Sequence, residues 1–176
     1  MTRQLVLVGL PGAGKSAVGR ALADRLGWQF VDLDTEIERE AGRTVAELFA
    51  AVGEPGFRQL ERTMTERYRV TSETVISTGG GWMAQPGLPA LLRPTSRIIH
   101  LIVSPEEAVR RMAFGRLARP LLAEAVDPVA ALQRLAQQRA AAYAMADRGV
   151  ETDGQTIDEV VATIVDHEAA LSGPTI

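Results

Sequence analysis

The octapeptide Gly9-Leu10-Pro11-Gly12-Ala13-Gly14-Lys15-Ser16 matches the pattern G-x-x-x-x-G-K-[ST] of a phosphate-binding loop. The four residues before it, 5–8, are all apolar, which is typical of a buried strand. The residues after it, 17–26, place valine and leucine side chains on one helical face. The loop therefore lies between a strand and a helix N-terminus, where backbone N–H groups and the helix dipole attract anions.

Two side chains of the loop point to a nucleoside triphosphate. Lys15 is expected to reach the β- and γ-phosphates, and the Ser16 hydroxyl is expected to bind Mg²⁺. Lys15 is also the only lysine among the nineteen Lys and Arg residues of the chain. A compact ammonium suits this position, and a planar guanidinium would not. The alternative, a glycine-rich turn that matches by chance, is disfavoured by the flanking strand and helix.

The composition indicates one globular domain without a nucleic-acid partner. The chain has 176 residues, of which 46% are hydrophobic, enough for a sizeable core. Its net charge is −3 and no basic patch stands out. The absence of cysteine excludes disulfides, a thiol nucleophile and a zinc–cysteine site. The apolar N-terminal run is too short for a signal peptide or a membrane span, so we expect a cytoplasmic protein with no membrane partner.

Strand-like and helix-like segments alternate along the rest of the chain. Further strands are expected at 28–33, 74–77, 98–103 and 150–152. Helices are expected at 35–41, 45–52 and 57–70, from 105, at 128–146 and from 157. Such alternation predicts an α/β fold with a parallel sheet covered on both faces. Ligands are then expected outside the carboxyl ends of the strands.

Two aspartates lie at the end of the second expected strand. P-loop enzymes often hold Mg²⁺ through an aspartate at the end of a later strand, but the later strands here end in Ser77 and Ser104. Because residues two apart in a strand share a face, Asp32 and Asp34 are expected to point into one site. The alternative is that Asp34 only caps the following helix.

The sequence Gly79-Gly80-Gly81 follows the third expected strand. It is either a flexible turn or a place where the backbone approaches a ligand with no side chain in the way. Three consecutive glycines lose more conformational entropy on folding than a simple turn requires, which favours the ligand interpretation.

Several arginines are candidates for anion binding. Arg58 lies in the first turn of an expected helix, and Arg139 shares the apolar stripe of its helix. An arginine in an apolar stripe either extends to solvent or is held for a carboxylate or phosphate. Arg116 and Arg119 lie in an interruption between two helices, at 114–122, that is typical of a mobile lid.

These motifs, in this order, resemble those of the shikimate kinases, a group of small P-loop kinases. They are the loop from Gly9 to Ser16, Asp32-x-Asp34 with Ile37-Glu38, Gly53-Glu54 with Phe57-Arg58 and Glu61, Gly79-Gly80-Gly81, Arg119-Pro120-Leu121-Leu122, and Arg139 followed by Tyr143. The resemblance covers nearly the whole chain. It implies one domain over 1–176, a five-stranded parallel sheet in the order 2-3-1-4-5, a substrate-binding subdomain at about 32–61 and a lid at about 112–124.

The resemblance also implies a reaction and its residues. ATP would donate its γ-phosphoryl group to the 3-hydroxyl of shikimate in aromatic amino-acid biosynthesis, on a monomeric enzyme with Mg²⁺ as cofactor. Shikimate would be bound by Asp34, Arg58, Gly80 and Arg139. ATP would be bound by Gly12, Ala13, Gly14, Lys15, Ser16, Ala17, Arg119 and Gln155. Ser16 would hold the metal, with Asp32 acting through water. Lys15, Asp34 and Arg119 would be catalytic, with Asp34 orienting the acceptor hydroxyl or accepting its proton.

Three other functions compete with this one. A sugar-acid kinase such as a gluconate kinase shares the scaffold and also needs arginines for a carboxylate. A regulatory module would bind ATP without turning over a metabolite. A GTPase switch is disfavoured because the chain has no Asn-Lys-x-Asp tetrad for guanine.

Overall fold

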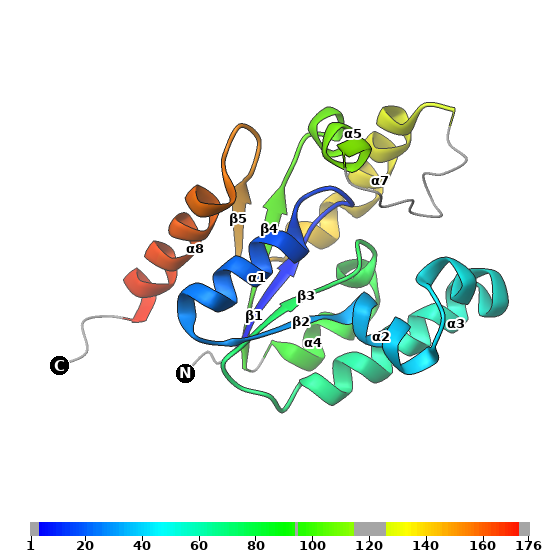
Figure 1. The fold of residues 1–176 in the computed structure, drawn as a ribbon, viewed down its shortest axis with the longest axis horizontal. Helices are drawn as coiled ribbons and strands as arrows, with labels where there is room; N and C mark the ends of the chain where they lie inside the picture. Colours follow the sequence, from blue (N-terminus) through cyan, green and yellow to red (C-terminus); the bar gives the residue numbers. More distant parts are fainter. Residues whose placement is uncertain (1–3, 94, 115–125, 173–176) are drawn as a thin grey trace.

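A five-stranded parallel sheet forms the centre of the protein. The computed structural model describes residues 4–93, 95–114 and 126–172. The strands are β1 (Gln4–Val8), β2 (Gln29–Asp32), β3 (Thr74–Ser77), β4 (Ser96–Ile102) and β5 (Arg148–Glu151). Their order in the sheet is β2-β3-β1-β4-β5, and all neighbours pair in parallel (Figure 1). The predicted α/β class and strand order are confirmed.

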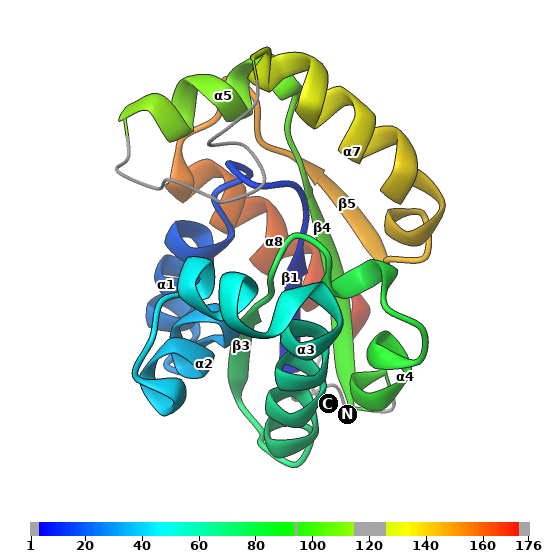
Figure 2. The same cartoon turned by 90° about the vertical axis from the view of Figure 1, so that its right-hand side faces the viewer.

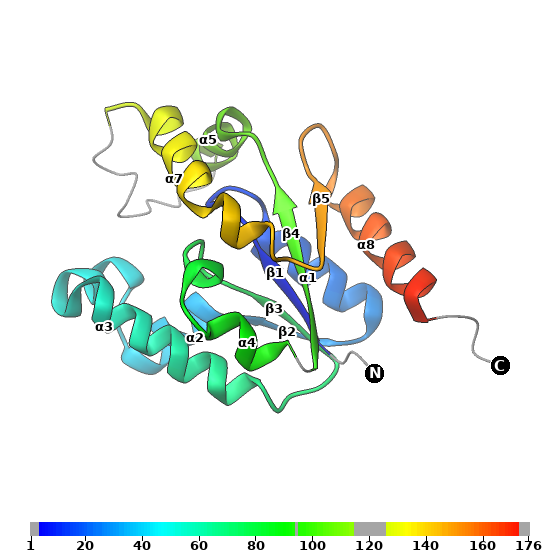
Figure 3. The same ribbon diagram turned by 180° about the vertical axis from the view of Figure 1, so that it is seen from behind.

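Helices cover both faces of this sheet. On one face lie α1 (Lys15–Leu26) and α8 (Ile157–Ser172), which pack against each other (Figure 1). The other face carries α3 (Val45–Tyr68), α4 (Leu88–Leu92) and α7 (Pro128–Tyr143), seen from behind in Figure 3. Every residue of β1 is buried, because this central strand has neighbours on both edges and helices on both faces.

The remaining helices lie toward the ends of the strands. Helix α5 (Pro105–Phe114) lies beyond the carboxyl end of β4, above the loop that joins β1 to α1 (Figure 2). Helix α2 (Leu33–Ala41) follows β2 and packs against α3. In the part of the chain that the structure describes, none of the helices combines the length and the apolarity needed to cross a bilayer.

Strand β2 ends earlier than the sequence indicated. Asp32 is the N-cap of α2, and its carboxylate accepts a hydrogen bond of 3.3 Å from the backbone N–H of Thr35. Asp34 therefore lies in the first turn of a helix, so the prediction that Asp32 and Asp34 share the face of a strand is wrong. The alternative in which Asp34 caps this helix is also wrong, because Asp32 occupies the cap.

Other boundaries differ in smaller ways. The helices expected at 45–52 and 57–70 form one element, α3, with a bend at Gly53 (φ 66°, ψ −179°). Thr44 and Glu47 form a capping box at its start. Helix α4 and the 3₁₀ turn η1 (Trp82–Ala84) were not predicted, because both are too short to show a hydrophobic period.

Candidate active site

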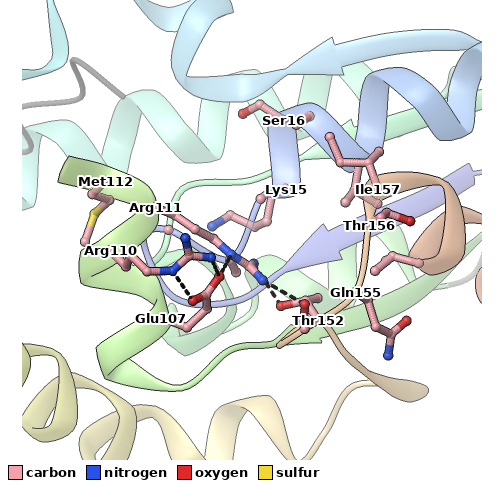
Figure 4. A pocket seen from close by; sticks show the side chains of 17 residues that line it. Lys15, Ser16, Glu107, Arg110, Arg111, Met112, Thr152, Gln155, Thr156 and Ile157 are labelled. Carbon is pink, nitrogen blue, oxygen red and sulfur yellow. Dashed lines mark hydrogen bonds and ion pairs between the residues drawn. The ribbon is translucent and has the colours of Figure 1, made fainter. Parts of the chain in front are cut away.

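A cavity of about 650 Å³ opens beside the loop between β1 and α1 (Figure 4). Three segments line it: residues 12–18 of the loop and α1, α5, and the chain that follows β5. The lining residues outside 12–18 are Glu107, Arg110, Arg111, Met112, Thr152, Gly154, Gln155, Thr156, Ile157 and Val160. All the residues predicted to bind ATP are therefore brought to one cavity, apart from Arg119, which lies outside the described residues.

The loop holds its lysine at the floor of this cavity. The Nζ atom of Lys15 donates hydrogen bonds of 2.9 Å to the carbonyl of Gly9 and 3.0 Å to that of Leu10. Lys15 is only 5% exposed. Gly12 takes a left-handed conformation (φ 82°), and a Cβ there would lie 2.6 Å from the carbonyl oxygen of Ala108 on α5. A residue other than glycine at this position would push the loop and α5 apart.

Ser16 and Asp32 form an oxygen-rich contact at the edge of the cavity. The Ser16 hydroxyl donates a hydrogen bond of 2.5 Å to Oδ2 of Asp32. Mg²⁺ in nucleotide sites takes one or two protein oxygens and completes its shell with water and phosphate oxygens. A hydroxyl and a carboxylate in direct contact fit that requirement, so these two residues are suited to hold the metal.

A charged cluster connects α5 to the end of β5 (Figure 4). Arg111 donates hydrogen bonds to the hydroxyl (3.0 Å) and the carbonyl (2.7 Å) of Thr152. Its Nε also donates to Glu107 at 2.8 Å, and Arg110 donates twice to the same carboxylate. Hydrogen bonds from the two arginines lower the pKa of Glu107 to about 2. Sequence reasoning missed this cluster, although Glu107, Arg110 and Arg111 have the i, i+3 and i+4 spacing of neighbours on a helix.

The glycines that follow β3 leave room for acidic side chains. A Cβ on Gly79 would lie 2.7 Å from Oε1 of Glu61 and 3.0 Å from Oδ1 of Asp34. Both acids therefore lie against the backbone of this glycine. Asp34 reaches this place from the first turn of α2, and Asp32 reaches Ser16 from the cap, so the two aspartates serve different parts of the site.

Two arginines lie against the next two glycines. A Cβ on Gly80 would lie 3.2 Å from Nη1 of Arg139 and 3.2 Å from Cδ of Pro11 in the phosphate-binding loop. A Cβ on Gly81 would lie 2.5 Å from Nη2 of Arg58. Three of the predicted acceptor-binding residues thus surround the fourth, and the cluster adjoins the nucleotide loop at Pro11. The glycines leave space for these side chains. Neither the flexible turn nor the backbone approach to a ligand, the two interpretations of the glycine run, included this requirement.

Glu61 belongs to the motifs named in the sequence analysis but was given no role there. Arg58 donates to it at 2.6 Å and donates to Glu54 at 2.8 and 3.2 Å. Burial of Glu61 raises its pKa to about 7, which the charge and hydrogen bond of Arg58 oppose and the negative charge of Asp34 reinforces. The signal in the sequence was an acid three residues after Arg58 on one helix.

The predicted lid at about 112–124 is only partly described. Helix α5 continues to Phe114, and Met112 lines the cavity. Arg116 and Arg119 lie outside the described residues, so the roles expected of them stay predictions.

Solved structures resemble this chain to different degrees, some in fold alone and some in sequence as well. A gluconokinase from Sinorhizobium meliloti 1021 superposes with a TM-score of 0.61 at 19% identity, covering 96% of this chain and 93% of the other. At that identity the likeness shows a shared fold alone. A shikimate kinase from Acinetobacter baumannii, solved in complex with shikimate, superposes with a TM-score of 0.90 at 31% identity, over 100% of this chain and 97% of the other.

Sequence comparison agrees with the closer structural likeness. A shikimate kinase from Symbiobacterium thermophilum is 43% identical over 163 residues, which is 92% of this chain and 94% of the relative. The family model for shikimate kinase matches residues 11–168, a span that includes most of the phosphate-binding loop and every acceptor-side residue described above. This chain belongs to the shikimate kinase family of ATP-dependent kinases.

Proposed function

We propose that this enzyme transfers the γ-phosphoryl group of ATP to the 3-hydroxyl of shikimate, forming shikimate 3-phosphate for aromatic amino-acid biosynthesis. The observation that carries the proposal is the convergence of Asp34, Arg58 and Arg139 on three consecutive glycines beside the nucleotide loop. Two guanidinium groups suit a carboxylate, and a carboxylate suits the hydroxyls of a cyclic acid. The relative solved with shikimate supports the same substrate.

Each side chain has a defined task in this proposal. Lys15 neutralises charge on the phosphates of ATP, which occupies the cavity beside the loop between β1 and α1. Mg²⁺, held by Ser16 with Asp32 acting through water, would supply further charge neutralisation when bound. Asp34 accepts a hydrogen bond from the acceptor hydroxyl and so aims its oxygen at the γ-phosphorus. Phosphoryl transfer depends mostly on such positioning and on charge neutralisation, because its loose transition state asks little of a strong base.

Remaining contacts complete the two substrate sites. Gln155 lines the nucleotide cavity on the side of the chain that follows β5, where the base of ATP would lie. Arg58 and Arg139 hold the carboxylate of shikimate, and the backbone of Gly80 closes the acceptor site beneath it. Arg119 from the lid would contact the transferred phosphate. Action as a monomer in the cytoplasm stays a prediction.

The test is a coupled assay of ADP release with purified protein, ATP and Mg²⁺. Shikimate is expected to stimulate ADP release and to be recovered as a phosphate ester by mass spectrometry, whereas gluconate is expected to do neither. Lys15→Met provides an inactive control in the same assay. Gluconate-dependent release would make the enzyme a sugar-acid kinase. ATP binding with no acceptor-dependent release would favour the regulatory module instead.

A further inference from the structure

A tyrosine that none of the tasks above involves lies against the acceptor site. Tyr143 ends helix α7, one turn after Arg139. Its hydroxyl donates a hydrogen bond of 2.8 Å to the carbonyl oxygen of Gly80, and the side chain is only 6% exposed. The guanidinium of Arg139 lies beside the same glycine, since a Cβ on Gly80 would lie 3.2 Å from its Nη1. Burial raises the pKa of Tyr143, and the positive charge of Arg139 opposes that rise. The phenol group is thus bonded to one residue of the acceptor cluster and lies near a second.

The bond to Gly80 acts on a part of the chain that has no side chains to fix it. The carbonyl of Gly80 belongs to the peptide that connects Gly80 to Gly81, so a donor on this oxygen fixes the plane of that peptide. Glycine backbones have more accessible conformations than any others. The carbonyls of Gly79 and Gly81 accept hydrogen bonds from the turn that follows them, whereas the carbonyl of Gly80 accepts one from another element of the fold. Tyr143 supplies that contact from a rigid helix.

The ring of Tyr143 is itself held by a specific contact. It stacks on the imidazole of His100, with ring centres 4.4 Å apart and planes inclined by 17°. His100 lies on β4, in register with Val8 at the end of β1. Both rings also border a second cavity of about 450 Å³ between α7 and strands β4 and β5. The stack and the hydroxyl contact together hold the ring in a defined position within the core.

We propose that Tyr143 is a positioning residue for the acceptor substrate. Its hydroxyl holds the Gly80 peptide, against which the Arg139 guanidinium lies, in the arrangement that receives the carboxylate of shikimate. Tyr143 does not itself take part in phosphoryl transfer. The inference rests on the proposed function, since it concerns the acceptor site of that reaction.

Kinetics of Tyr143→Phe test the proposal directly. The variant keeps the ring and its stack and removes only the hydroxyl. Loss of one net hydrogen bond in the acceptor site is expected to raise KM for shikimate roughly fivefold, with KM for ATP unchanged. Tyr68→Phe is the matched control, because Tyr68 is the only other tyrosine and its hydroxyl donates to Glu36 at 3.0 Å, outside the acceptor cluster. Tyr68→Phe is expected to leave both KM values unchanged.

A second measurement, by ¹⁹F NMR, keeps Tyr143 in the acceptor site. Labelling with 3-fluorotyrosine gives two ¹⁹F signals, which Tyr68→Phe assigns. Saturating shikimate is expected to shift the Tyr143 signal, and ADP alone is expected to leave it in place. This readout decides the question if Tyr143→Phe fails to fold.

The outcomes separate the two proposals. An active wild-type enzyme together with an unchanged KM for shikimate in folded Tyr143→Phe overturns the role of Tyr143 and leaves the proposed function standing. An equal rise in KM for shikimate and for ATP would indicate a merely structural tyrosine and would also overturn the role of Tyr143. A Tyr143 fluorine signal that does not shift with shikimate would overturn that role as well. A wild-type enzyme that does not phosphorylate shikimate overturns both proposals.

Discussion

Arg58 donates a hydrogen bond of 2.6 Å from Nη1 to Oε2 of Glu61, whose side chain has no exposed surface. Burial raises the pKa of Glu61 to about 7 in spite of this partner. The carboxyl therefore changes its charge near neutral pH. Because a buried ion pair loses hydration that its mutual attraction only partly replaces, this pair is suited to hold a guanidinium in place rather than to stabilise the fold.

The pH dependence of stability should reveal this carboxyl. Glu61 binds a proton more readily in the folded protein (pKa about 7) than at its ordinary pKa of 4.5. Its contribution to the free energy of unfolding is therefore fully present below the ordinary pKa and is lost as pH rises through the folded one. The difference in Tm between the wild type and Glu61→Gln is expected to fall from about pH 5 to about pH 8. Glu66→Gln, at a half-exposed position of the same helix, is the control. If the difference in Tm between the wild type and Glu61→Gln stayed constant with pH, the raised pKa would be contradicted.

Asp34→Asn should separate nucleotide binding from turnover. The amide keeps the size of the side chain but removes the charge that orients the acceptor hydroxyl. A fall in kcat of about 10²-fold or more is expected, with the Kd for ATP retained in calorimetry. Glu36→Gln, two residues further along α2, is the matched control. Near-normal kcat in Asp34→Asn would remove Asp34 from the mechanism.

Arg139→Ala should weaken the acceptor alone. A guanidinium bonded to a carboxylate contributes more than a neutral hydrogen bond, so KM for shikimate is expected to rise about tenfold or more. KM for ATP should be unaffected. Arg134→Ala, an exposed position on the same helix, should change neither value. An effect confined to ATP would show that Arg139 does not bind the carboxylate.

Asp32→Asn tests the metal contact without removing the helix cap. Asparagine caps a helix as well as aspartate does, so α2 should stay intact. Loss of the charge beside Ser16 is expected to raise the Mg²⁺ concentration for half-maximal activity about tenfold, and chelation of Mg²⁺ should abolish turnover of the wild type. Titration of activity with Mg²⁺ measures the shift. An unchanged Mg²⁺ requirement at unchanged Tm would exclude Asp32 as a metal-site residue.

Arg111→Ala should weaken the binding of ATP. Arg111 ties α5 to Thr152 through two hydrogen bonds, so its removal loosens one wall of the nucleotide cavity. KM for ATP is expected to rise roughly fivefold. KM for shikimate serves as the internal control, because Arg111 does not contact the acceptor cluster. A change in shikimate KM alone would refute this division of the site.

The fold could be predicted almost completely because local and global signals coincide. Residues 5–8 of strand β1 are all apolar since the strand is buried on both faces, and the loop after it has the residue spacing of a phosphate-binding loop. The helix starts at 45, 128 and 157 were predicted correctly, because Thr44, Asp127 and Thr156 are residue types that favour the N-cap. The end of β2 was predicted one residue too late. Leu33 is apolar like the strand residues before it, and an N-cap at Asp32 does not change the hydrophobic pattern of the sequence.

The candidate site could be predicted only where a motif marked it. Asp34 was chosen on the wrong geometric ground, and it nevertheless lies with Arg58 and Arg139, because the ends of β2 and β3 meet at one edge of the sheet. Glu61 could not be identified from the sequence as buried and protonatable, since its burial depends on Gly79, eighteen residues further along the chain. The contact of Tyr143 with Gly80 depends on tertiary packing in the same way.

Lys15, the only lysine of the chain, allows occupancy of the nucleotide cavity to be measured by chemical labelling. An amine-directed reagent has a single side chain to modify besides the α-amino group. Reductive methylation with ¹³C-formaldehyde would therefore place one isotopic label at Lys15, where the ammonium rests on two backbone carbonyls. The rate of that labelling would follow occupancy of the phosphate pocket, with no engineered tag and no second lysine to confuse the signal.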